Sequence, residues 1–327
     1  MDLRQELLQR AEWFNKEMAK FLEDGEPKTL YDAARHLPLA GGKRLRPSLA
    51  MITCEALGGD VKKIFPIAIA LELVHNFTLV HDDIMDKSSL RRNLPTVHIK
   101  YDEPTAIIAG DLLFAKAFES MYNMVESPEN FKKLNYGLLE CVREICEGQQ
   151  LDMEFEKRNT VTEQEYIEMI RKKTAFFFQF AAESGAILAN ASDDEIAAMN
   201  TYGLSIGLAF QIQDDYLDMS SDEETLGKDI GNDIRNGKKT LIAARSLSTA
   251  EGEDKELLKQ VFGNRNATDL EIKKVYDLFW RIKSIDYAKQ TAVDYSLKAK
   301  ESLSVLPESS AKQILIDLAD YTIKREK

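Results

Sequence analysis

The sequence predicts an all-α protein, and three observations support this fold class. Pro128 and Pro307 bracket a long segment without proline, in which apolar residues recur at the spacing of packed helices. Within this segment, Thr162, Ser192 and Thr268 are each followed three residues later by Glu, which is the capping box of a helix start. No run of alternating β-branched residues predicts a strand. We therefore expect roughly ten or more helices.

The remaining segments follow in chain order. Residues 1–18 are charged and amphipathic, and residues 41–47, GGKRLRP, interrupt the helical pattern with two glycines and a proline. Residues 71–80 and 204–210 are apolar and predict buried helices. Residues 219–240 are polar, charged and contain glycine, which is typical of a lid or binding loop.

Composition narrows the class of protein. The 327 residues, 44% of them hydrophobic, are enough for one large domain or two. The net charge of −12, without a basic stripe, argues against a nucleic-acid partner. Three cysteines without paired spacing fit a reducing compartment. Because there is no signal peptide, and no uncharged apolar run approaches the ~20 residues that span a bilayer, we expect a cytoplasmic protein without a transmembrane segment.

An Asp-Asp-x-x-Asp signature occurs twice, and each copy follows an apolar stretch. Its aspartates are Asp82, Asp83, Asp86, Asp214, Asp215 and Asp218. In a helix, residues three or four apart share a face, so each copy directs two carboxylates the same way. Carboxylates extending from buried helices need cations or hydrogen bonds to offset their lost hydration. Carboxylate oxygens suit Mg²⁺, whose coordination is usually completed by substrate phosphates. Two such clusters facing each other predict a site for a magnesium-bound di- or triphosphate.

Such a site also needs fixed positive charge. The candidate cations are Lys43, Arg46, Arg91, Arg92, Lys173, Lys228 and Lys238. Arg91 lies nine residues after Asp82, two to three turns further along if the helix continues that far. His75 lies seven residues before Asp82 on nearly the same face, and either donates to the ligand or is a satisfied core histidine.

These ordered motifs resemble the trans-isoprenyl diphosphate synthases, also called polyprenyl synthetases, most closely the short-chain geranylgeranyl diphosphate synthases. The resemblance runs from GGKRLRP into the C-terminal third. It includes the stretch from Gly110 to Phe118, which is similar to the family's Gly-Asp-x-Leu helix, and a Gly-Gln block, Glu147-Gly148-Gln149 to Asp152. It implies one helical domain over residues 1–327, built around a central apolar cavity, and a homodimer. The C-terminal residues 323–327 are less basic than the tail that closes the isopentenyl pocket in some members.

The resemblance also implies roles for individual residues. Isopentenyl diphosphate is held by Lys43, Arg46, His75 and Arg92. The allylic diphosphate is bound through roughly two or three Mg²⁺ ions held by the six aspartates. The residues expected to bind it directly and to take part in its ionisation are Arg91, Lys173, Thr174, Gln211, Lys228 and Lys238.

The implied reaction is ionisation of an allylic diphosphate of C5 to C15, attack by isopentenyl diphosphate, and proton loss to the released diphosphate. Phe77 and Thr78, five and four residues before Asp82, stand where the family sets chain length, and a single aromatic there indicates a C20 product. C15 and C25 products are the alternatives. A class I terpene cyclase is less favoured because its second metal motif normally contains Asn, Ser or Thr and Glu. A noncatalytic synthase subunit is less favoured because both motifs are intact.

Overall fold

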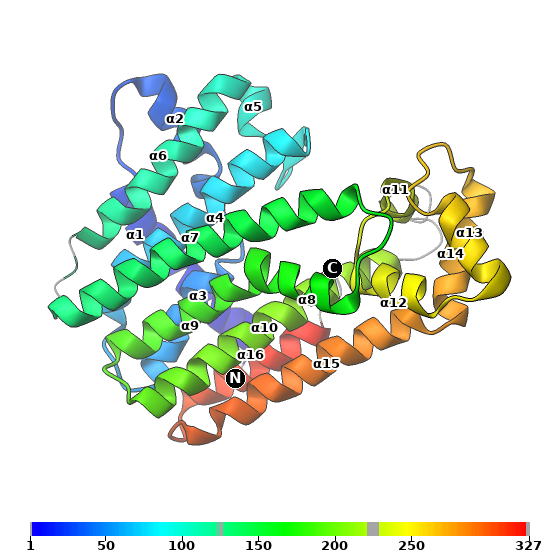
Figure 1. The fold of residues 1–327 in the computed structure, drawn as a ribbon. Coiled ribbons are helices and arrows are strands. Elements are labelled where there is room, and N and C mark those ends of the chain that lie inside the picture. The colour runs from blue at the N-terminus through cyan, green and yellow to red at the C-terminus, as the bar shows by residue number, and fades with distance from the viewer. Residues whose placement is uncertain (1, 123, 125–126, 221–228, 325–327) are drawn as a thin grey trace. The chain divides into compact units, whose positions relative to one another are not determined.

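The computed structural model describes residues 2–122, 124, 127–220 and 229–324, with the backbone alone at residues 229–232 (Figure 1). The described chain is almost entirely helical, so the all-α prediction with ten or more helices is confirmed. Each predicted capping box is present: the Thr162, Ser192 and Thr268 side chains accept from the backbone of the Glu three residues later. Helix starts were therefore read correctly from local chemistry.

The chain divides into two compact units. The first comprises residues 1–142, 180–200 and 305–317, and the second residues 143–179, 201–304 and 318–327. The division falls within helices α7 (Pro128–Glu156), α9 (Phe176–Leu188), α10 (Asp193–Ser220) and α16 (Ser310–Lys324), and within the short turn η4 (Leu303–Val305).

In the first unit, α4 packs along α6, and α3 and α1 pack against α4 (Figure 1). The elements confined to this unit are α1 (Leu3–Phe21), α2 (Lys28–His36), η1 (Pro38–Ala40), α3 (Leu45–Ala56), η2 (Val61–Ile64), α4 (Phe65–Met85), β1 (Leu90–Arg91), β2 (Leu94–Pro95), α5 (Val97–Lys100) and α6 (Glu103–Tyr122). The two-residue strands β1 and β2 form a hairpin that the sequence pattern did not predict.

Helix α4 is the most apolar of the long helices in this unit. With the preceding turn, Val61–Met85, it is long and apolar enough to cross a membrane, but 61% of its most apolar window is buried inside the protein. Ile67, Leu71 and Val74 are fully buried. This burial is typical of a helix in the core of a protein.

In the second unit, α12 and α14 pack against α15, and α13 packs against α14. The elements confined to it are α8 (Glu163–Ile170), the π-helical turn η3 (Arg171–Ala175), α11 (Asp229–Asn236), α12 (Leu241–Thr249), α13 (Gly252–Val261), α14 (Asp269–Arg281) and α15 (Ser284–Ser302). Its core includes Tyr166, Ile212, Val275 and Phe279. Residues 219–240, predicted to form a loop, contain helix α11, and residues 221–228 lie outside the described part of the chain.

Candidate active site

Both aspartate motifs lie in the last turns of a helix. Helix α4 ends at Met85 with Asp86 as its C-cap, and α10 ends at Ser220, two residues after Asp218. The C-terminal end of a helix carries partial negative charge, so carboxylates there are unfavourable unless cations lie beside them. The position of each motif therefore favours cation binding.

The middle aspartate of the first motif is buried and ion-paired. The Asp83 side chain is 2% exposed, and its Oδ1 accepts a hydrogen bond from Arg91 Nε at 2.8 Å. Burial raises the pKa of Asp83, and the contact with Arg91 opposes that rise. Asp82 is half-buried and Asp86 is exposed, so these two carboxylates are the more accessible pair. Asp83 is placed to orient Arg91.

Arg91 reaches this position on a β-hairpin. The helix does not continue to Arg91, because α4 ends at Met85 and Lys87 has a positive φ of 54°. In the hairpin, Arg92 and Asn93 form the loop and both have positive φ, as a type I′ turn requires. This turn directs the two adjacent arginines to different partners.

Arg92 binds the glycine loop, residues 41–44, which joins η1 to α3. Its Nη1 donates to the carbonyl oxygens of Gly41 and, at 3.3 Å, Leu37. Gly42 has a φ of 138°, and a Cβ there would lie 3.0 Å from the Arg92 guanidinium carbon. A side chain at position 42 would be both strained and crowded. Arg92 therefore lies against the loop that carries Lys43, whereas Arg46, predicted to belong to the same interruption, lies in the first turn of α3.

This loop is anchored by Arg44, a residue that was not predicted from the sequence. Its guanidinium is buried, donates to Glu72 Oε1 and to the Pro38 carbonyl oxygen, and donates from Nε to Asn15 Oδ1 at 2.9 Å. Asn76 Nδ2 donates to the same Glu72 oxygen at 3.1 Å. Arg44 thus ties the loop to α1, η1 and α4, while Lys43 stays exposed.

We expect Arg44→Met to lower the free energy of unfolding by about 3–5 kcal/mol, because it leaves the Glu72 carboxylate buried without its cation. Denaturant unfolding measures this loss. The adjacent exposed variant, Lys43→Met, serves as control and should change stability by less than about 0.5 kcal/mol. Equal effects of the two variants would show that the buried pair does not anchor the loop.

Positive charge is concentrated around His75. Burial first, then the charges of Arg46, Arg92, Arg91 and Arg44, hold the pKa of His75 well below its usual value. The histidine is therefore neutral at physiological pH and retains one ring N–H donor. Burial lowers the pKa of Arg46 to about 10, so this residue remains charged. The cluster has the character of an anion site.

In the second unit, the middle aspartate is again buried. Tyr166 Oη donates to Asp215 Oδ2 at 2.6 Å, and Gln211 Nε2 lies 3.4 Å from Asp215 Oδ1. Burial raises the pKa of Asp215 to about 6, against the lowering effects of Lys238, Tyr166 and Gln211. Thr174 Oγ1 donates to Gln211 Oε1 at 3.0 Å and completes a hydrogen-bonded chain.

Lys238 lies among three carboxylates. Its Nζ is 3.9 Å from Asp215 Oδ1, 3.9 Å from Asp218 Oδ2 and 3.5 Å from Asp233 Oδ2. Burial lowers the pKa of Lys238, but these three carboxylates raise it more, so the net shift is upward. Asp214 is half-buried and Asp218 is exposed, which repeats the arrangement of the first motif.

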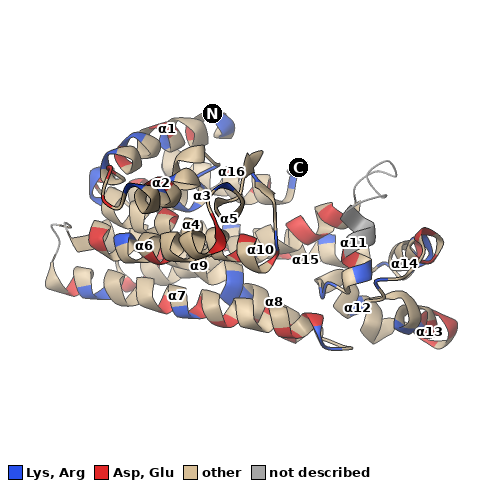
Figure 2. Ribbon diagram, turned by 90° about the horizontal axis from the view of Figure 1, so that it is seen from above, with Lys and Arg blue, Asp and Glu red and all other residues tan. Residues whose placement is uncertain are grey.

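Lys173 and Thr174 lie on the π-helical turn η3. Such turns are wider than an α-helix and occur often at functional sites. Lys173 Nζ pairs with Asp152 Oδ2 at 2.6 Å. Acidic and basic residues are interspersed along α7 (Figure 2), and α7 also supplies Glu144 and Glu147, which pair with Arg171 and Lys172.

Two glycines make room for the π-helical turn. A Cβ at Gly148 of α7 would lie 2.3 Å from the Lys173 backbone nitrogen, and one at Gly207 of α10 would lie 2.4 Å from Ala175 Cα. Both contacts are with backbone atoms, which cannot swing aside as a flexible side chain can. The position of Lys173 and Thr174 therefore depends on the absence of side chains at both glycines.

We expect Gly148→Ala to reduce kcat/KM by about 10- to 100-fold, since the methyl group displaces the turn carrying Lys173. An alanine inside a helix is otherwise favourable by up to about 1 kcal/mol, so the sign of the stability change is informative. Thermal unfolding measures the stability, and steady-state kinetics with Mg²⁺ and the substrates that the resemblance implies, isopentenyl diphosphate and an allylic diphosphate, measure the activity. Met153→Ala, an exposed change on the same helix, is the control. A stabilised, fully active Gly148→Ala protein would contradict this dependence.

The predicted chain-length residue Phe77 begins a row of aromatic rings. Its ring centroid lies 5.0 Å from that of His81 and 5.6 Å from that of Phe114, and Phe114 lies 5.2 Å from Phe118. Gly110 of α6 permits the approach, because a Cβ there would lie 2.2 Å from His81 Nε2. The row thus crosses from α4 to α6.

Thr78 is less prominent than Phe77. Its Oγ1 donates to the carbonyl oxygen of His75 at 2.8 Å, so its hydroxyl is satisfied on its own helix. The prediction of a chain-length role for Thr78 stays untested.

The aspartates fit a metal that shares its coordination with a substrate. Among the described residues, no three His, Cys, Asp or Glu side chains converge closely enough to hold a metal ion. Mg²⁺ is commonly bound by one or two carboxylates together with substrate phosphates and water. The accessible pairs Asp82 with Asp86, and Asp214 with Asp218, match that mode of binding.

The predicted residue Lys228 lies outside the described residues, as do Arg325 and Lys327 of the C-terminal tail, to which no role was assigned. Some contact residues were not predicted. Tyr166 and Arg44 were missed because their carboxylate partners are 49 and 28 positions away in the sequence. Phe114 carried a signal in its four-residue spacing from Phe118 on one helix face.

A comparison with protein families identifies the family of this chain. The polyprenyl synthetase family profile matches residues 27–279 of the chain. The chain belongs to the polyprenyl synthetase family. The match includes the glycine loop, both aspartate motifs and the π-helical turn, so the resemblance inferred from the motifs is confirmed.

Archaeal relatives of this polyprenyl synthetase match over its whole length. It is 44% identical over 326 residues to the short chain isoprenyl diphosphate synthase of Methanothermobacter thermautotrophicus, and 42% identical over 326 residues to the geranylgeranyl diphosphate synthase of Methanosarcina mazei; each alignment covers 100% of this chain and 99% of the relative. The crystal structure of the Pyrococcus horikoshii geranylgeranyl pyrophosphate synthetase is similar, with a TM-score of 0.93 and 42% identity over 99% of this chain and 98% of that one.

Proposed function

We propose that this polyprenyl synthetase condenses isopentenyl diphosphate with an allylic diphosphate of C5 to C15 to give an all-trans prenyl diphosphate. The observation that carries the proposal is the repeated arrangement of the motifs. Each lies at a helix C-terminus, with its middle aspartate buried beside a cation, Arg91 or Lys238, and its outer aspartates accessible. This arrangement suits shared coordination of a diphosphate.

In this proposal, Mg²⁺ is held by the outer aspartates Asp82, Asp86, Asp214 and Asp218, and the buried Asp83 and Asp215 orient Arg91 and Lys238. When bound, the metal neutralises negative charge that develops on the departing diphosphate. Arg91, Lys173, Lys228 and Lys238 add fixed positive charge to the allylic diphosphate. Lys43, Arg46, Arg92 and the neutral His75 hold isopentenyl diphosphate.

The reaction intermediate is an allylic cation, which the chain stabilises without a nucleophile. Thr174 and Gln211 offer oxygen atoms, and their mutual hydrogen bond limits their freedom to react. The double bond of isopentenyl diphosphate attacks the cation, and the released diphosphate accepts the proton. Apolar walls exclude water, which would otherwise capture the cation.

We propose a C20 product, with C15 and C25 as the alternatives. The support is the aromatic row beginning at Phe77, which places three rings on α4 and α6 on the N-terminal side of the first aspartate motif. Bulky rings at that depth limit how far a growing chain extends. The same features argue against a long-chain product.

The chain is further proposed to act as a single catalytic domain, residues 1–327, in a cytoplasmic homodimer. Exposed apolar residues on α6 and α7 support dimer formation: Ile107, Ile108, Tyr136 and Leu139 are 42%, 52%, 62% and 48% exposed. Ile107 with Ile108, and Tyr136 with Leu139, each place two exposed apolar side chains close together on one helix, and grouped apolar side chains are a feature of protein interfaces. Light scattering coupled to size-exclusion chromatography tests the stoichiometry.

The deciding experiment incubates the protein with Mg²⁺, isopentenyl diphosphate and each of the C5, C10 and C15 allylic diphosphates, and then sizes the products. We expect geranylgeranyl diphosphate from all three, and no turnover with EDTA. Cyclic hydrocarbon products would identify a terpene cyclase instead. Absence of any condensation would point to a noncatalytic subunit.

A further inference from the structure

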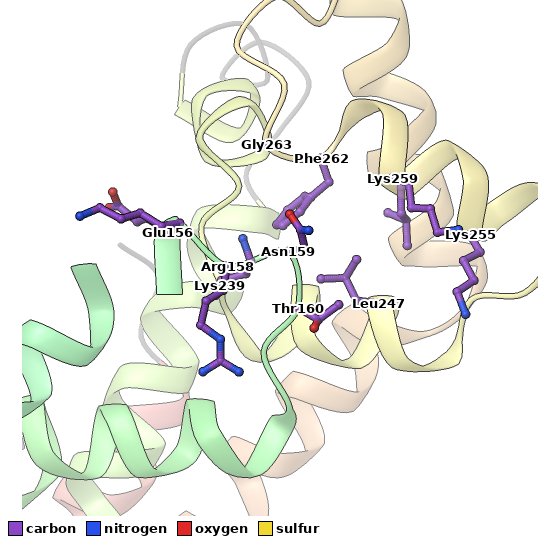
Figure 3. A pocket seen from close by; sticks show the side chains of 12 residues that line it. Glu156, Arg158, Asn159, Thr160, Lys239, Leu247, Lys255, Lys259, Phe262 and Gly263 are labelled. Atoms are coloured by element: carbon purple, nitrogen blue, oxygen red, sulfur yellow. The ribbon is translucent and has the colours of Figure 1, made fainter. Parts of the chain in front are cut away.

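A pocket lies in the second unit, among the end of α7, the loop after it, α12, α13 and the segment before α12 (Figure 3). Its volume is about 440 Å³. None of the residues that line it has a role in the proposed reaction. Figure 3 shows Lys255 and Lys259 extending from α13, with Leu247 between Lys255 and Thr160 of the loop after α7.

The lining is strongly basic in a protein whose net charge is −12. Its cations are Lys157, Arg158, Lys239, Lys255 and Lys259, and its acidic residue is Glu156. Arg158 pairs with Glu165 and Lys259 with Glu256, at 2.7 Å in both cases. Within the described residues no ion pair joins Lys157, Lys239 or Lys255 to a carboxylate, so positive charge in the pocket exceeds negative charge.

Lys239 is the buried member of this group. It is 7% exposed, its Nζ donates to the Gly237 carbonyl oxygen at 2.7 Å, and it lies 5.1 Å from the centre of the Phe262 ring. An ammonium group has three donors, so this set of contacts leaves the charge undersatisfied. Burial lowers the pKa of Lys239, opposed by the charge of Glu156. A buried cation that, among the described residues, has no carboxylate within ion-pair distance favours binding of an anion.

We infer that this pocket binds a diphosphate group, and that the bound anion draws Lys239 away from Gly237 and so shifts the adjacent Lys238. Several ammonium groups around one volume suit a compact, multiply charged anion, because point charges need no fixed bidentate geometry. The regulatory part of this inference rests on the proposed function, in which Lys238 contacts the substrate. The binding part does not.

The pocket is linked to Lys238 by backbone hydrogen bonds of the turn at Gly237. Gly237 has a φ of 66°, and its nitrogen donates to the Ile234 carbonyl oxygen at 3.2 Å. Gly263, at the rim of the pocket, donates to the same oxygen at 2.8 Å, and a Cβ on Gly237 would lie 2.9 Å from Gly263 Cα. Moving the Lys239 ammonium therefore disturbs the turn from which Lys238 reaches Asp215 and Asp218.

Two sources supply a diphosphate group: free inorganic diphosphate, and the head group of a prenyl diphosphate. The pocket also has an apolar wall formed by Leu247, Leu258 and Phe262. Equal affinity for inorganic diphosphate and geranyl diphosphate would assign the site to the free anion. Affinity for geranyl diphosphate higher by about tenfold, or 1.4 kcal/mol, would assign it to a prenyl head group.

Isothermal titration with inorganic diphosphate in EDTA tests the binding, because the lysines need no metal. We expect the double variant Lys255→Gln with Lys259→Gln to raise the dissociation constant of diphosphate at the pocket by about tenfold or more, and to leave any other diphosphate site unchanged. Lys274→Gln combined with Lys298→Gln, two exposed lysines outside the pocket, is the matched control and should leave binding unchanged. A second double variant, Lys43→Gln with Arg46→Gln, weakens diphosphate binding at the proposed isopentenyl site, so that binding at the pocket is measured separately.

Kinetics test the regulation separately. The pocket variant should keep the turnover of the parent at low product concentration but lose a noncompetitive component of inhibition by diphosphate. Identical stoichiometry and dissociation constants for parent and pocket variant would overturn the site. Loss of binding with no change in inhibition would overturn the link to Lys238, and neither result depends on which prenyl product the protein makes.

Discussion

Asp82→Ala and Asp214→Ala are each expected to reduce Mg²⁺-dependent turnover by at least about 1,000-fold, because each removes an accessible carboxylate from a cation site. Both residues are half-buried near the end of a helix, where the helix dipole already disfavours negative charge. Removing either carboxylate should therefore leave stability unchanged or slightly raised. Steady-state rates across a range of Mg²⁺ concentrations measure the loss, and thermal unfolding measures stability.

Asp286→Ala is the matched control, since Asp286 is an exposed aspartate in the first turn of α15. This variant should retain full activity. Turnover of Asp82→Ala or Asp214→Ala within a few fold of the parent would refute the metal assignment. A third variant, Asp83→Asn, distinguishes metal binding from orientation of Arg91. Asp83→Asn should lower kcat/KM but leave the Mg²⁺ requirement unchanged.

Phe77→Ser is expected to lengthen the product beyond C20. The substitution removes a ring that contacts both His81 and Phe114, and it opens space between α4 and α6 into which the prenyl chain extends. A cavity of this kind also costs stability, about 3–5 kcal/mol for a fully buried Phe and less for the half-buried Phe77. Reversed-phase separation of the products, coupled to mass spectrometry, gives the chain length.

Leu79→Ser provides the control, because Leu79 lies two residues further along α4 and faces away from Phe77. It should leave the product at C20. Unchanged product length in Phe77→Ser would show that this ring does not limit the chain. Longer products from both variants would instead indicate a general loosening of α4.

The sequence predicted the helices well because their signals are local. The capping boxes at Thr162 and Thr268 involve residues three positions apart, and their hydrogen bonds form as expected. The aspartate motifs were found for the same reason, since their spacing is read within one helical turn. The family assignment, which rested on the order of these motifs, is confirmed by the match over residues 27–279.

What local spacing did not reveal is how each motif is supported. Asp83 and Asp215 look equivalent to their neighbours in the sequence, yet both are buried, and their partners Arg91 and Tyr166 lie on other elements. The stop of α4 at Met85 depends on a backbone conformation at Lys87 that no residue type there announces. Local sequence spacing therefore could not predict long-range contacts, or positive φ values at residues other than glycine.

The π-helical turn carries a consequence for the chain's periodicity. One turn of this kind accommodates an extra residue relative to an α-helix, so the buried faces of α8 and α9 are out of phase by about 100° across residues 171–175. Tyr166 and Met169 precede this shift, and Phe177 and Phe178 follow it. Deleting one residue from the turn would restore a uniform helix and rotate one buried face into solvent. The number of residues in this region is therefore constrained, whichever side chains those residues carry.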